Sequence, residues 1–146
     1  MIEKLEFNLT LSGRYWDKAP AYEVLLNDEV VTRGVIDKAS EEQFDIHFTR
    51  EVAEDSEHRL IVRFLNKEDS DTIENADKTD ILKDMILNID ALSIDGIDVG
   101  NLLWTNSEYF DTEGNSIMTE CVNLGKNGDW VFKFSAPFYI WLLEII

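Results

Sequence analysis

The chain has 146 residues, of which 45% are hydrophobic and 11% aromatic, so it can bury the core of one ordinary domain. Its 30 acidic and 13 basic side chains give a formal net charge of −17, which disfavours nucleic acid and membrane surfaces as partners, because both need a basic face. Cys121 is the single cysteine, which excludes an intrachain disulfide and a cysteine-based zinc site; we expect it to be a small buried residue.

The N-terminal part of the chain alternates apolar and polar residues with a period of two, which predicts half-buried β-strands. A first strand is expected over residues 5–11, ending at Ser12-Gly13. Segments 21–26 and 30–35 flank Asn27-Asp28-Glu29. Because Asn and Asp tolerate the backbone angles of tight turns, we predict a hairpin there.

A second hairpin is expected from segments 44–48 and 60–64, which both alternate and are separated by the polar run 51–58. After a long acidic loop, a further strand is expected over 85–94, closed by a turn at Asp95-Gly96. Other short strands are expected near 97–99, 107–111, 116–123 and 129–134.

The strand over 85–94 carries a regular alternation that assigns its side chains to two faces. One face is expected to hold Ile86, Asn88, Asp90, Leu92 and Ile94. The other is expected to hold Leu87, Ile89, Ala91 and Ser93. The spacing of all these strands, without a repeat or a linker, predicts an all-β fold: an antiparallel β-sandwich forming a single domain over 1–146.

Three segments follow one another in an order that a known family shares. They are Pro20–Val24, His58–Asn66 and Asp84–Gly96, with the acidic loop before the third. This order resembles the jelly-roll carbohydrate-binding modules that bind xylan through calcium, over roughly residues 5–97. The resemblance implies a jelly roll, glycan binding and a Ca²⁺ site. Two differences stand out: Lys67 replaces an acidic residue, and Met85-Ile86 replace an Arg-Asn pair.

The acidic loop offers the oxygen atoms that calcium requires, about six to eight per ion. The candidate metal ligands are Asn66, Glu68, Asp69, Asp71, Asp80 and Asp84. The segment Asp69–Asp80 has the length of a helix-loop-helix calcium loop, but it lacks the mid-loop glycine and places Ile73 at a ligand position, which excludes that motif. The alternative is a solvated acidic loop that binds no metal.

Aromatic side chains in loops form a second candidate site, because sugars bind to flat apolar rings. The candidates for glycan binding are Tyr15, Trp16, Trp104 and Tyr109. The alternative is that Trp16 and Trp104 seal the ends of the sandwich. Trp130, Phe132 and Phe134 share one face of a strand and are expected in the core.

Catalysis is not expected. His47 and His58 lie inside predicted strands without a neighbouring nucleophile, and the chain has no Gly-rich phosphate loop.

Residues 137–146 form an apolar docking segment, predicted as a short helix or strand, in which Pro137 suits the first turn of a helix. One alternative is that the segment packs on its own domain and closes the sandwich; the other is that it inserts into a neighbouring subunit. The candidate interface residues are Phe138, Tyr139, Trp141, Leu142 and Ile145.

The pattern Trp-x-Phe-x-Phe at 130–134, followed by Pro-Phe-Tyr-x-Trp-Leu-Leu-Glu at 137–144, is similar to small structural proteins of tailed bacteriophages. This resemblance implies a capsid decoration, tail or fibre component that assembles with itself or with other virion proteins. The chain starts without a secretory signal and has no membrane-spanning segment, so we expect it in a virion or in the cytoplasm. The sequence favours a non-catalytic virion assembly subunit; the alternative is a calcium-dependent glycan-binding module that takes a polysaccharide.

Overall fold

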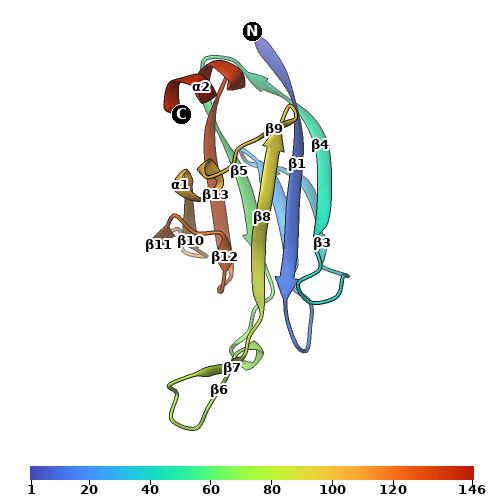
Figure 1. The fold of residues 1–146 in the computed structure, drawn as a ribbon, viewed down its shortest axis with the longest axis vertical. Coiled ribbons are helices and arrows are strands. Elements are labelled where there is room, and N and C mark those ends of the chain that lie inside the picture. Colours follow the sequence, from blue (N-terminus) through green and yellow to red (C-terminus); the bar gives the residue numbers. More distant parts are fainter.

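Two antiparallel sheets pack face to face in the computed structural model, which describes residues 1–146 (Figure 1). The strands of the first sheet are β1 (Ile2–Arg14), β4 (Phe44–Ala53), β8 (Ile86–Ile94), β9 (Ile97–Asp98) and β12 (Asn123–Leu124). Their order is β12-β8-β1-β4, and β9 pairs with β8. This architecture confirms the predicted all-β, antiparallel β-sandwich.

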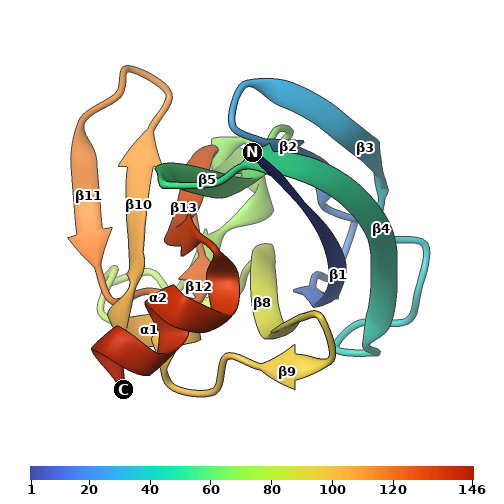
Figure 2. The same ribbon diagram turned by 90° about the horizontal axis from the view of Figure 1, so that it is seen from above.

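The second sheet has the order β11-β10-β13-β5-β2-β3. Its strands are β2 (Ala21–Leu26), β3 (Glu29–Val35), β5 (Ser56–Phe64), β10 (Ser107–Asp111), β11 (Ser116–Thr119) and β13 (Gly128–Ala136). Viewed from above, β10 and β11 lie on one side of β5 and β13, and β2 and β3 lie on the other (Figure 2). The outer face of this sheet is therefore flanked by two hairpins.

The remaining elements are short. They are a 3₁₀ turn η1 (Asp69–Asp71), the strands β6 (Ile73–Glu74) and β7 (Ile81–Lys83), and the helices α1 (Leu102–Thr105) and α2 (Phe138–Ile145). The β6–β7 hairpin projects from one end of the sandwich, while both chain termini lie at the other end (Figure 1). No helix is both long enough and apolar enough to cross a membrane.

The core forms where alternate residues of the two sheets meet. The inward residues of β1 are Leu5, Phe7, Leu9 and Leu11, all fully buried. Trp130, Phe132 and Phe134 of β13 face them, as the sequence predicts. The ring of Phe7 stacks on that of Phe48 at 4.8 Å and meets Phe134 edge to face at 5.9 Å. Aromatic contacts thus join both sheets.

The first predicted hairpin is confirmed, because β2 and β3 pair on either side of the Asn27 turn. The second predicted hairpin is wrong. Strands β4 and β5 are consecutive, but β4 pairs with β1, while β5 pairs with β2 and β13, so their connection crosses from one sheet to the other. The polar run 51–58 is not a long loop. Most of it forms the end of β4 and the start of β5, where Val52 and His58 are buried. The His58 Nε2 atom forms a hydrogen bond there with the Ala53 carbonyl oxygen, at 2.7 Å.

Strand β8 does not keep the single alternation that the sequence suggests. Its pairing with β1 skips Asp90, which forms a β-bulge. Leu87 and Ile89 are buried before the bulge, and Leu92 and Ile94 are buried after it. The predicted division into two faces is therefore wrong. Because of the extra residue, odd-numbered side chains face the core before Asp90 and even-numbered side chains face it afterwards.

The predicted strand over 116–123 divides into β11 and β12, which belong to different sheets. Glu120, with a φ of 56°, turns the chain between them. Cys121 follows and is only 6% exposed, as expected for a small core residue. Its carbonyl oxygen accepts hydrogen bonds from Trp130 Nε1 at 2.7 Å and from Ser107 Oγ at 2.9 Å.

Helix α2 begins directly after Pro137 and packs against the end of its own sandwich. Phe138 and Leu142 are buried, and the Trp141 ring contacts Phe132 edge to face at 6.4 Å. The side chains on its outer face are exposed: Tyr139, Ile140, Leu143, Ile145 and Ile146. The apolar C-terminal segment therefore contributes one face to the core and leaves the other uncovered.

Candidate functional site

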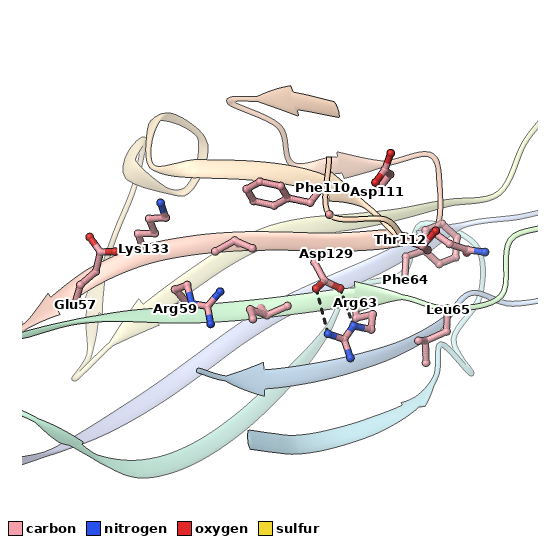
Figure 3. Close-up of a pocket in the computed structure, with 15 residues that line it drawn as sticks. Glu57, Arg59, Arg63, Phe64, Leu65, Phe110, Asp111, Thr112, Asp129 and Lys133 are labelled. Carbon is pink, nitrogen blue, oxygen red and sulfur yellow. Dashed lines mark hydrogen bonds and ion pairs between the residues drawn. The ribbon is translucent and has the colours of Figure 1, made fainter. Parts of the chain in front are cut away.

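A groove of about 700 Å³ lies on the outer face of the second sheet, over β5, β13 and β10 (Figure 3). Its floor consists of Ile61 and Val131, which are only 3% and 5% exposed and form a small apolar cluster with Leu25, separate from the main core. The half-buried ring of Phe110 packs on this cluster from β10. The outer face of a sheet is usually polar, so apolar residues there need a cover, and the Phe110 ring supplies part of it.

Charged side chains border the floor, beginning with a bidentate ion pair. Arg63 Nε lies 2.7 Å from Asp129 Oδ1, and Arg63 Nη2 lies 3.1 Å from Asp129 Oδ2 (Figure 3). Arg63 Nη1 also reaches Glu23 Oε1 at 3.1 Å, and Glu23 in turn binds Arg33 at 3.2 Å. The hydrogen bonds with Asp129 raise the pKa of Arg63 further above its usual range. This row of planar groups is fixed by strand pairing and by mutual contacts.

The same two strands place more polar groups farther along the groove. Arg59 and Lys133 are direct cross-strand neighbours, and Glu57 lies beside them. Arg59 Nη2 is 3.1 Å from Asp28 Oδ1 in the β2–β3 turn. This end of the groove therefore carries both positive and negative groups.

The opposite end of the groove is closed by the turn between β10 and β11. Asp111 Oδ1 accepts hydrogen bonds from the amides of Glu113 and Asn115, both at 2.9 Å, and the backbone bond from Asn115 is the largest cause of a lowered pKa at Asp111. Gly128 allows β13 to approach β10 closely, because a Cβ there would lie 2.0 Å from the Phe110 carbonyl oxygen. The groove is thus framed by a rigid turn.

The residues predicted as calcium ligands do not converge on one point. Glu68, Asp69 and Asp80 are exposed. The Asn66 side chain joins two loops instead, since its Oδ1 accepts from the Ala21 amide at 2.8 Å. No three Asp, Glu, His or Cys side chains gather in an arrangement that could hold a metal ion.

Two lysines neutralise the carboxylates that are least exposed in this loop. Lys18 Nζ lies 3.1 Å from Asp71 Oδ2, and Lys67 Nζ lies 2.6 Å from Asp84 Oδ1. Burial acts to raise the pKa of Asp84, but the hydrogen bonds from Lys67, Thr72 and the Met85 amide outweigh it and lower the pKa. An ammonium group repels a metal ion and offers it no lone pair, so these residues do not fit the calcium site that the sequence resemblance implies.

The four aromatic candidates have different environments. Trp16 and Trp104 are 42% and 49% exposed, so neither is a buried seal of the sandwich. Trp16 Nε1 donates to the Asp71 carbonyl at 2.9 Å, and the Lys83 ammonium lies 5.0 Å from its ring centre, which brings this ring beside the acidic loop. Tyr15 is half-buried, and its hydroxyl donates to the Lys38 carbonyl.

Tyr109 is different, because its ring is 3% exposed and belongs to the core. Its hydroxyl oxygen accepts from the Lys126 amide at 3.0 Å, and burial raises its pKa to about 12. A buried ring offers no face to a sugar.

The groove is not among the sites predicted from the sequence. Its signal was present in two strands, where three consecutive apolar residues interrupt the alternation: 60–62 in β5 and 130–132 in β13. The middle residues, Ile61 and Val131, are cross-strand partners and point away from the core. Apolar residues on both faces of paired strands indicate that both faces are covered or bind a ligand.

No protein-family model matches the sequence, and no curated protein is significantly similar to it. Two solved structures are similar in fold. The first, a carbohydrate-binding module described as vCBM60 in complex with galactobiose, is 12% identical, with a TM-score of 0.53 over 87% of this chain and 96% of that one. The second, a selenomethionine form of vCBM60, is 11% identical, with a TM-score of 0.52 over 86% of this chain and 89% of that one.

The second structure is described in connection with two families of calcium-dependent carbohydrate-binding modules that are linked by circular permutation. At these identities the likeness concerns the fold. The chain has the β-sandwich fold of carbohydrate-binding modules.

Proposed function

We propose that the protein is a non-catalytic glycan-binding module that holds a polysaccharide in the groove of the second sheet. The observation that carries this proposal is the half-buried ring of Phe110, which packs on Ile61 and Val131 and lines the same groove as the fixed Arg63–Asp129 pair. Sugar rings have apolar C–H faces and hydroxyl groups at their edges, so they match a partly exposed aromatic ring beside planar hydrogen-bonding groups.

The fold supports the same proposal. Both similar structures are named as carbohydrate-binding modules, and one contains galactobiose. This favours glycan binding over the virion role that the sequence analysis preferred, and it favours binding over catalysis. Calcium is not part of the proposal, because Lys67 and Lys18 already neutralise the buried carboxylates of the loop.

The test is a binding experiment with three single variants. Wild-type protein is titrated calorimetrically with soluble galactan, xylan, mannan and β-glucan, and the best ligand is then measured with Phe110→Ala, Trp16→Ala and Trp104→Ala. All three side chains are at least partly exposed, so each variant should fold. We expect Phe110→Ala to weaken binding about tenfold or more, and the two tryptophan variants to bind as the wild type does.

The outcomes separate the two candidate sites. Loss of binding in Trp16→Ala or Trp104→Ala, with Phe110→Ala unaffected, would move the site to the loops. A wild-type protein that binds none of the polysaccharides at millimolar sugar would contradict glycan binding for this set of ligands.

A second function is favoured by one observation, the uncovered outer face of α2 with Tyr139, Ile140 and Leu143. An exposed apolar patch of this kind is typical of protein contacts and suits assembly with a second copy or with another virion protein. Light scattering of the wild type and of Ile140→Asp over a range of concentrations tests it. Assembly predicts an oligomer that the variant loses, whereas a wild-type monomer at every concentration argues against self-assembly.

A further inference from the structure

The base of the β6–β7 hairpin contains a carboxylate that is enclosed by hydrogen-bond donors. Asp84 Oδ1 receives Lys67 Nζ at 2.6 Å, Thr72 Oγ1 at 2.7 Å and the Met85 amide at 2.8 Å. The side chains of Lys67 and Asp84 are only 11% and 14% exposed. A carboxylate withdrawn from water to this extent needs a positive partner, and here that partner is an ammonium group.

The backbone of Lys67 is held by a reciprocal pair of hydrogen bonds with the Asn127 side chain. The Lys67 amide donates to Asn127 Oδ1 at 2.7 Å, and Asn127 Nδ2 donates back to the Lys67 carbonyl at 2.9 Å. Asn127 stands just before β13 and lines the groove on the outer face. The reciprocal pair therefore fastens the start of the acidic loop to the second sheet, and Lys67 then fastens the end of the loop at Asp84.

A second ion pair repeats the arrangement nearby. Lys18, from the β1–β2 loop, binds Asp71 Oδ2 at 3.1 Å and Glu68 Oε1 at 2.9 Å. Asp71 is 3% exposed and also accepts from the Glu68 amide at 2.7 Å. Lysine ammonium groups thus hold the loop at its two least exposed carboxylates, the buried Asp71 and the partly buried Asp84.

We propose that the Lys67 ammonium group takes the place of a divalent cation in this fold, so that the acidic loop is held without calcium. A bound metal ion would gather carboxylate and carbonyl oxygens from separate loops around one positive charge. Lys67 instead brings a covalently attached positive charge to one carboxylate oxygen, Asp84 Oδ1. The inference concerns the stability of the loop and of the fold, and it stands whether or not the groove binds a glycan.

The experiment compares melting temperatures in EDTA and in 5 mM calcium for the wild type, Lys67→Met and Lys67→Asp, with exposed Lys4→Met as the matched control. We expect the wild type and Lys4→Met to melt at the same temperature in both solutions. Lys67→Met is expected to melt about 5 to 10 °C lower in both, because Asp84 loses its counter-ion. Lys67→Asp should also have a lower melting temperature in EDTA. In calcium it should regain part of that loss, since the introduced carboxylate and Asp84 then both offer oxygen atoms to the ion.

Three results would overturn the proposal. A wild-type melting temperature that rises with calcium and falls with EDTA means that a metal ion, not Lys67, holds the loop. A Lys67→Met variant as stable as the wild type means that the ammonium group is dispensable. A Lys67→Asp variant without a calcium response means that this position does not suit a divalent cation.

Discussion

Arg63 and Asp129 face each other on the outer surface of β5 and β13 and share two nearly parallel hydrogen bonds of 2.7 and 3.1 Å. A planar guanidinium and a planar carboxylate hold each other in one orientation in such a pair. Groups that are already oriented lose little conformational freedom when a ligand arrives. In the proposed glycan-binding function, these groups would meet the hydroxyl groups of a sugar already oriented.

Arg63→Ala is expected to weaken polysaccharide binding about tenfold, because it removes donors from the groove and releases Asp129. Arg33→Ala is the matched control, since Arg33 also binds Glu23 but does not line the groove. Calorimetric titration of both variants measures the difference. Equal weakening by the two substitutions would mean that overall charge, and not the groove, governs binding.

Phe138→Ala is expected to lower the free energy of unfolding by about 3 to 5 kcal/mol, because the side chain is 1% exposed and packs against Phe134 and Trp141. Tyr139→Ala, one residue farther along α2, removes an exposed ring and should change stability by about 0.5 kcal/mol or less. Urea denaturation of the two variants gives both values. A loss in Tyr139→Ala as large as that in Phe138→Ala would contradict the conclusion that only Phe138 of this pair packs in the core, because alanine itself favours the helix.

The sequence predicted the strands and the sandwich well, because the period of two in β1 reports directly that Leu5, Phe7, Leu9 and Leu11 are buried. It failed where pairing partners decide the structure. The β4 and β5 segments read as a hairpin, and only the packing of two sheets sends them to different partners. The acidic loop differs from the predicted metal site for a similar reason, since its carboxylates pair with Lys18 of the β1–β2 loop, pair with Lys67 at the start of the loop itself, or remain exposed.

Tyr109 should make the fold sensitive to alkali. Because its pKa is raised to about 12 by burial, the folded state holds the phenol proton more tightly than the unfolded chain, whose tyrosines titrate near pH 10. Its contribution to stability is complete below about pH 10 and is lost as the pH rises through about 12. Tyr109→Phe should therefore lose about 2 kcal/mol less stability than the wild type over this interval.

Urea denaturation at pH 9 and at pH 11.5 measures this difference, with exposed Tyr139→Phe as the control. Burial also raises the pKa of Tyr22, so some alkaline loss should remain in Tyr109→Phe. An identical pH dependence in the wild type and in Tyr109→Phe would contradict the assignment.

Cys121 should resist thiol reagents in the native protein. It is 6% exposed, and its Sγ contacts the Asn123 carbonyl at 3.1 Å. Labelling requires local opening of the segment between β11 and β12, so we expect modification by an aromatic disulfide reagent to be at least about a hundredfold slower than in urea. A native rate close to the denatured rate would mean that this segment opens readily.

The bulge at Asp90 divides β8 into two stretches that are out of phase with each other, because one residue has no partner on β1. Before it, odd-numbered Leu87 and Ile89 face inward; after it, even-numbered Leu92 and Ile94 do. Without Asp90, Ile89 and Ala91 would be consecutive and would pair with Leu11 and Thr10 in a regular ladder, so the same four apolar side chains would face inward in a single alternation. The extra residue thus bends and twists β8 locally beside β1, while the strand gives the same apolar side chains to the core on both sides of the bulge.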